Sequence, residues 1–341
     1  MDFQSNATLD SCSDESAELA LKYSRVLGHM PQTFGVAIRG LMSDYANGGG
    51  LSEGTLFQLR RLIKAPTLLA SLYFGSKTFF PHLFRADAQK TPSDLIALYD
   101  PFCLAAVLSN IYLYKRCKRV CNKEEWRFIA EPLQRNLEIG VRLGSEYKPV
   151  GMGPGLMTSF VFYAFASFLA HDTPGFVDYR RHLKRNELDF DPHYELCHWG
   201  CTSVQIASNL LISLGFGVSA ATSYFQGTSC DVKSIAAIPG PSQPFALIRR
   251  WLSSVHIKVG SGRMPGNEFG SMAAEQRSAL LQDISETLEN GSKYRWLERT
   301  KLDVNSLDMP DLIIPPDMLE DVRDAGMEDA GPEGEPVEAA H

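Results

Sequence analysis

Two sets of residues in this chain have types and spacings that could bind a metal ion. His171 and Asp172 are adjacent and end the most apolar run of the sequence, GLMTSFVFYAFASFLAHD. Such a dyad, joined by a distant histidine and aspartate, can hold a divalent ion that activates water for phosphoester hydrolysis. In the second set, His193, Cys197 and Cys201 are spaced four residues apart, so one helix would align them on one face as zinc ligands that need one more donor.

The residues around both sets favour structural roles. Thr173-Pro174-Gly175 ends any helix directly after the dyad, whereas a productive dyad lies within a helix that faces a cavity. We therefore interpret His171 as an exposed residue near the negative end of a helix dipole. Structural zinc sites usually draw ligands from two separated clusters, and buried cysteine commonly packs as a small hydrophobic residue. We predict no catalytic residue, and the candidate metal ligands are His171, Asp172, His193, Cys197 and Cys201.

Other catalytic signatures give no support for an enzyme. Gly151-Met152-Gly153-Pro154-Gly155 is glycine-rich, but it lacks the preceding strand and the Lys-Ser/Thr ending of a phosphate-binding loop. The sequence contains neither a Gly-x-Ser-x-Gly elbow nor a His-Glu-x-x-His zinc motif. We predict no cofactor.

The net charge of −7 is unevenly distributed along the 341 residues. The segment from Asp317 to His341 holds nine acidic residues and one basic residue, Arg323, a net charge of −8. The rest of the chain therefore carries about +1 and gives no global reason to bind nucleic acid.

Cysteine content and hydropathy favour a cytoplasmic protein. The seven cysteines are an odd number without the density of a secreted disulfide scaffold, and the first twenty residues have no basic and apolar signal pattern. The apolar segment Leu156–Ala170 would span roughly 22 Å as a helix, which is less than the ~30 Å hydrocarbon layer. We interpret it as a core helix and expect no membrane contact.

Apolar periodicity predicts a compact all-α bundle of short helices. No period-2 strand pattern occurs in the first two thirds of the chain. The segment from Phe176 to Leu188 is expected to be exposed, amphipathic and rich in Arg and Lys. Helices are predicted in the segments 19–27, 34–41, 51–63, from 67, from 93, 101–113, 124–144, 156–170, 176–188, 193–214, 245–259 and 272–288.

Composition divides the chain into four parts. Residues 1–18 are polar and acidic and are predicted to be disordered, and residues 19–230 form the main helical domain. Residues 231–310 form a C-terminal helical extension. Residues 311–341 form a disordered acidic tail that contains one apolar patch, Leu312-Ile313-Ile314.

Several segments between Pro31 and Gly227 are similar, in order, to motifs of one family. Leu62-Ile63-Lys64-Ala65-Pro66-Thr67-Leu68 resembles a Leu-Ile-x-x-Asp-Pro-x-Leu turn, and Gly75-Ser76-Lys77-Thr78-Phe79-Phe80 resembles an Ala-Asn-Ser-Ala-aromatic segment. Trp126 fits the start of the central helix, and the stretch from Ser203 to Phe216 resembles His-x-Glu-Val-Gly-x-x-Leu-Leu followed by Trp-Gly-Leu. The chain resembles the HDOD family, helical output domains of bacterial signalling proteins that are related to HD-type phosphohydrolases. The resemblance implies an HD-like helical bundle.

The chain departs from this family where the family carries polar residues. Phe162-Tyr163 stands at the position of the His-Asp dyad, and His171-Asp172 lies nine residues later. Ser203 and Gln205 replace the later His and Glu, and Tyr224-Phe225 replaces a frequent His-His pair. The resemblance thus implies a pseudoenzyme: a non-catalytic regulatory module of signal transduction that acts through contacts with an unidentified protein partner.

Two alternatives remain open at the level of sequence. The first is an atypical HD-type metal-dependent phosphohydrolase that uses His171 and Asp172 with His182 or His193. The second is a helical protein with a structural zinc site at His193, Cys197 and Cys201.

Overall fold

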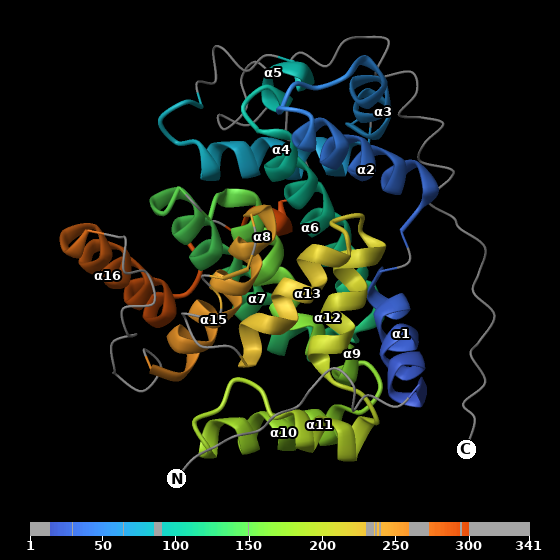
Figure 1. Ribbon diagram of the computed structural model, residues 1–341, viewed down its shortest axis with the longest axis vertical. Coiled ribbons are helices and arrows are strands. Elements are labelled where there is room, and N and C mark those ends of the chain that lie inside the picture. The colour runs from blue at the N-terminus through green and yellow to red at the C-terminus, as the bar shows by residue number, and fades with distance from the viewer. Residues whose placement is uncertain are drawn as a thin grey trace.

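The computed structural model describes residues 14–28, 30–63, 65–84, 91–148, 150–229, 235, 237–238, 240–258, 273–293 and 295–299. Within these ranges the chain forms helices and no strand, so the predicted all-α class is confirmed (Figure 1). Residues 1–13 of the predicted N-terminal disordered segment lie outside the described residues, as does the whole predicted acidic tail 311–341.

In the described ranges the helices are of two kinds, α-helices and 3-10 helices. Three of them are 3-10 helices: η2 (Phe162–Phe165), η3 (Gly240–Ser242) and η5 (Trp296–Glu298). The α-helices are α1 (Asp14–Gly28), α2 (Gln32–Ala46), α3 (Glu53–Ile63), α4 (Pro66–Phe79), α5 (Pro92–Ile96), α6 (Pro101–Val120), α7 (Lys123–Glu146), α8 (Met152–Val161), α9 (Ala166–Leu169), α10 (Thr173–Arg185), α11 (Pro192–Trp199), α12 (Ser203–Ser213), α13 (Val218–Ser229), α15 (Gln243–Lys258) and α16 (Ala274–Asn290).

Three differences from the predicted helices change where a helix begins or is interrupted. α1 begins at Asp14, inside the segment predicted to be disordered, where Asp14 and Glu15 favour a helix N-terminus. The predicted helix 156–170 is interrupted by η2, in which Tyr163 has non-helical dihedrals. The predicted helix 193–214 is divided because Gly200, with φ of 72°, adopts the left-handed conformation that ends α11.

The central contact of the bundle is the crossing of α7 and α8, which glycine makes possible. Gly140 and Gly144 lie one turn apart on α7. Gly140 faces Gly155, which lies in the first turn of α8, and Gly144 faces Gly151, the residue before α8 begins. A Cβ atom at Gly140 would collide with the carbonyl oxygen of Gly155, and a Cβ at Gly155 would collide with the carbonyl oxygen of Gly140. The two backbones therefore touch directly, as they do where small residues repeat every four positions at a helix interface.

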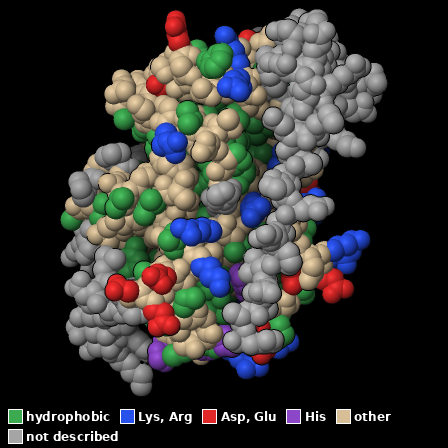
Figure 2. All heavy atoms as spheres, turned by 90° about the vertical axis from the view of Figure 1, so that its right-hand side faces the viewer, with side chains coloured by type: hydrophobic (Ala, Val, Ile, Leu, Met, Phe, Trp, Pro, Cys, Tyr) green, Lys and Arg blue, Asp and Glu red, His purple; other side chains and the backbone are tan. Residues whose placement is uncertain are grey.

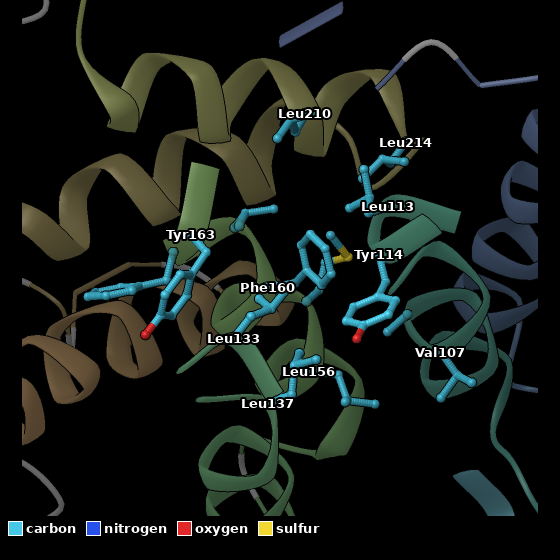
Figure 3. Close-up of a cluster of buried hydrophobic side chains, with 14 of the residues drawn as sticks. Val107, Leu113, Tyr114, Leu133, Leu137, Leu156, Phe160, Tyr163, Leu210 and Leu214 are labelled. Carbon is cyan, nitrogen blue, oxygen red and sulfur yellow. The ribbon is translucent and has the colours of Figure 1, made fainter. Parts of the chain in front are cut away.

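One hydrophobic core surrounds this crossing. Figure 3 shows a part of it in which α6, α7, α8 and α12 meet, with Val107, Leu137, Phe160 and Leu210 among the buried side chains. The predicted C-terminal extension shares the core, because Trp251 and other buried residues of α15 belong to the same cluster. Residues on both sides of position 230 thus pack as one body.

The run through α8, η2 and α9 is the one stretch of the described chain that could cross a membrane by length and composition. It covers Met152–Leu169, and 89% of it is buried inside the protein. Its place in the middle of the bundle is that of a core helix.

We expect Gly155→Ala to lower the free energy of unfolding by roughly 1–3 kcal/mol, because the added methyl group forces the α7 and α8 backbones apart. The matched control is Gly54→Ala on α3, where a Cβ meets no atom within 4 Å. That change should be neutral or stabilising by up to ~1 kcal/mol. Urea unfolding monitored by circular dichroism measures both, and equal small effects would contradict the close crossing.

Candidate functional site

The metal-ligand candidates lie in and around a hairpin of two antiparallel helices, α10 and α11. Figure 1 places this hairpin at one end of the molecule, and Figure 2 shows histidine side chains at the same end. Each helix begins at an aspartate N-cap: Asp172 accepts a hydrogen bond from the amide of Gly175 (3.0 Å), and Asp191 accepts one from the amide of Tyr194 (3.0 Å). The N-terminus of each helix thus has its own carboxylate.

Each N-cap aspartate also contacts a histidine from the last turn of the other helix. His198 Nε2 lies 2.9 Å from Asp172 Oδ2, and His182 Nε2 lies 2.7 Å from Asp191 Oδ2. The hydrogen bonds from Gly175 and His198 hold the pKa of Asp172 below its usual value. Burial alone would raise the pKa of Asp191, but the Tyr194 amide and His182 lower it overall. The two contacts join the helix ends in a reciprocal pattern.

A buried glutamate fastens this hairpin to α12. Glu195 is 1% exposed and accepts hydrogen bonds from the Tyr179 hydroxyl (2.6 Å) and from the Ser203 amide (2.6 Å) and hydroxyl (2.8 Å). Burial raises the pKa of Glu195 to about 7, although these donors favour the charged form. Ser203, which stands where the family resemblance places a histidine, therefore serves as a partner of Glu195.

His171 and Asp172 do not form a shared metal site. His171 is exposed just beyond α9, as predicted, and its ring lies edge-to-face against Tyr23 at 4.7 Å. Partial desolvation and the nearby Lys22 lower the pKa of His171. Asp172 is engaged by Gly175 and His198. The dyad therefore divides between two different environments.

The candidate zinc face at His193, Cys197 and Cys201 is also not formed. His193 and Cys197 are neighbours on α11, with Sγ 3.8 Å from His193 Nε2. Cys201 lies beyond Gly200, where the helix has ended, and it is completely buried. Throughout the described ranges, no group of three or more His, Cys, Asp or Glu side chains is placed to hold a metal ion.

The structure instead reveals a cavity that sequence reasoning missed, which we call the aromatic groove. It has a volume of about 470 Å³, within the range of ligand-binding pockets, and it lies between α7, η2, α10 and α15. Phe162 and Tyr163 form part of its wall. The residues that line it are Phe128, Ile129, Pro132, Phe162, Tyr163, Phe165, Phe176, Val177, Arg180, Arg181, Leu183, Lys184, Leu188, Asp189 and His256.

Polar groups deep in the groove are held by specific partners. His256 Nε2 donates to Asn136 Oδ1 (2.9 Å), and its ring stacks on Phe162 with centroids 5.0 Å apart. Burial lowers the pKa of His256 to about 4, and Arg180 acts in the same direction, so this imidazole is neutral at pH 7. Asp189 pairs with the buried Arg249 at 2.8 Å. The acidic group of the groove is thus neutralised.

Two further polar groups in the wall have unused hydrogen-bonding capacity. No described residue bonds to the Tyr163 hydroxyl, which Figure 3 shows directed away from Phe160 and the packed side chains around it. Proline has no N–H, so Pro132 gives the carbonyl of Phe128 no helical hydrogen bond. Both groups could interact with a bound chain.

The rim of the groove is cationic and partly apolar. Arg180 and Lys184 lie one turn apart on the exposed face of α10, and the Arg180 guanidinium lies 5.2 Å from the centre of the Phe165 ring. Neither cation has a carboxylate partner among the described residues, whereas Arg181 pairs with Asp178. Phe128 and Leu188 also reach solvent, with exposed fractions of 62% and 40%.

This arrangement has the side-chain types of a binding surface. Its lining offers aromatic surface, two free cations and neutral hydrogen-bonding groups, and no nucleophile within it is paired with a base. In the sequence, two features belong to this groove: the basic segment 176–188 and the aromatic pair Phe162-Tyr163. Their convergence with His256, more than 65 residues later in the chain, could not be read from spacing.

Glu195→Gln should change the pH dependence of stability. Because the folded pKa of about 7 lies above the unfolded value near 4.5, the Glu195 contribution is fully present below pH 4.5 and is lost as pH rises through 7. The stability of wild type relative to Glu195→Gln should therefore fall by about 1 kcal/mol per pH unit between pH 5 and 7. Urea unfolding of both proteins at several pH values measures this difference, and parallel profiles would contradict the buried carboxyl group.

Comparison with protein-family models, with curated proteins and with solved structures finds no match to this chain. The aromatic groove and the helices that build it are therefore the basis for inferring function.

Proposed function

We propose that this chain is a non-catalytic, HDOD-like regulatory module of the bacterial cytoplasm that acts by binding a protein partner through the aromatic groove. The partner segment would be acidic and carry apolar side chains. The observation that carries this proposal is the pairing of an open aromatic wall with the two unpartnered cations, Arg180 and Lys184.

The groove has the composition of a protein interface. Aromatic residues and arginine are enriched where protein partners bind most tightly, and lysine or arginine at a rim steers acidic partners toward the surface. Phe128 is 62% exposed beside this rim, so a large apolar side chain faces water when the groove is empty. Covering it with a partner's apolar side chain would remove that surface from water.

The contacts of the metal-ligand candidates support a non-catalytic function. Asp172 and His182 hold the ends of α10 and α11, and Glu195 fastens the hairpin to α12. These groups stabilise the element that carries the cationic rim. Hydrolysis would require them to converge on one ion, and the described side chains have no such arrangement.

Binding of the partner should depend on the charge of the groove. We expect Arg180→Glu/Lys184→Glu to reduce enrichment of the partner at least tenfold when tagged chain is isolated from its native cells and co-purifying proteins are quantified by mass spectrometry. The matched control is Arg60→Glu/Arg61→Glu, which makes the same charge change on the exposed face of α3 at the opposite end of the molecule (Figure 1). Equal enrichment by wild type and both variants would contradict the proposal.

Metal analysis separates this proposal from the two metal-dependent alternatives. The purified chain should contain zinc and other divalent metals far below one equivalent by mass spectrometry of the elements. Hydrolysis of a generic phosphodiester should not change with His171→Ala. About one bound metal per chain together with hydrolysis lost in that variant would establish the phosphohydrolase, and bound zinc lost with Cys197→Ser would establish the structural zinc site.

A further inference from the structure

The acidic tail of this chain has the chemistry that the aromatic groove would recognise. We propose that residues 311–341 occupy the groove of their own chain, with Leu312-Ile313-Ile314 against the aromatic wall and the acidic residues that follow beside Arg180 and Lys184. This inference deepens the proposed function and rests on it, since it names what covers the same surface when no partner is bound.

The charges of the tail and of the groove are complementary. From Asp317 onward the tail holds nine acidic residues against one arginine, whereas the body of the chain is close to neutral. Arg180 and Lys184 are exposed and have no carboxylate partner in the described part of the chain. The segment with the greatest acidic charge and the unpaired cations of the groove therefore belong to one molecule, and their attraction is of the kind that salt weakens.

The order of residue types in the tail matches the order of surfaces in the groove. Three consecutive apolar residues, Leu312, Ile313 and Ile314, precede the acidic residues and are separated from them by Pro315-Pro316. In the groove, aromatic side chains of η2 and α7 lie beside the cations of α10. A chain that places its apolar patch on the wall therefore carries its acidic residues to the rim.

The chain between Arg299 and Leu312 is long enough to connect the described structure to the groove. The described C-terminal part ends at Arg299, directly after Glu298, whose Oε1 accepts a hydrogen bond from Gln134 Nε2 on α7 (2.9 Å). Thirteen residue steps from Arg299 to Leu312 can span roughly 45 Å when extended. Phe128 of the groove lies six residues before Gln134 on α7, which is about 9 Å along the helix. The extended connection is several times longer than this separation, so the tail is long enough to reach the groove.

Because the tail is part of the same chain, it can also regulate the access of a partner to the groove. A tethered segment acts at an effective concentration of the order of millimolar, so contacts that are weak in a free peptide suffice to cover the groove. A partner with the same acidic and apolar chemistry must displace the tail. Access to the groove would then depend on any event that weakens the tail contact, such as high salt.

Hydrogen–deuterium exchange of the full-length chain, with no partner present, tests this inference. We expect the amides of residues 311–320 to exchange at least tenfold more slowly in wild type than in Arg180→Glu/Lys184→Glu, and to accelerate in wild type at 1 M salt. Arg60→Glu/Arg61→Glu should exchange like wild type. Unchanged exchange in the α6 and α8 core of each variant would verify that the fold is intact.

A second variant tests the contact from the tail side. Ile313→Asp should speed exchange in α10 while it leaves the groove residues themselves unaltered. The proposal would be overturned if residues 311–320 exchanged at the same rate in wild type and in Arg180→Glu/Lys184→Glu, whether that common rate is fast or slow. Protection that grows with protein concentration would also overturn it, because a second copy's tail would then fill the groove. Because no partner is present, failure here leaves the co-purification result to decide the proposed function separately.

Discussion

The direct backbone contact of α7 with α8 is the constraint on which the rest of the structure depends. Gly140 and Gly155 each leave space for the other's carbonyl oxygen, so the two helices approach more closely than side chains would permit. The chain that leaves α8 therefore enters η2 beside α7, and the rings of Phe162 and Tyr163 join Phe128 and Pro132 around one cavity. The close packing of α7 and α8 thus places the aromatic residues of η2 beside α7, where they form the wall of the aromatic groove.

Polar contacts then hold the basic helix against that opening. Two aspartate–histidine contacts join α10 to α11, and the buried Glu195 ties both to α12 through Tyr179 and Ser203. Removing one member of such a buried network is costly, because its partners are left unpaired in a low-dielectric interior. Asp172 and His182, two of the residues considered as metal ligands, thus help to hold α10, which carries the cations of the groove.

Sequence patterns predicted the helical class and most helices because apolar periodicity and caps act locally. They failed where tertiary contacts decide the local backbone: η2 interrupts a uniformly apolar run, and Gly200 separates Cys201 from the helix that carries Cys197. The sequence indicates only two parts of the groove, the basic segment 176–188 and the pair Phe162-Tyr163. His256, Pro132 and Phe162 are distant in sequence, and only the fold brings them together.

We infer that the aromatic groove is a docking surface for a chain segment with acidic and apolar side chains. Phe128 and Phe57 have similar exposed fractions, 62% and 59%, but lie on α7 at the groove and on α3 far from it. A photoreactive phenylalanine at each position, activated in living cells, therefore gives the most direct test. We expect crosslinks from position 128 to an acidic segment, of the tail or of a partner, and only background from position 57. Equal yields at both positions, or crosslinks from 128 to segments of unrelated composition, would contradict it.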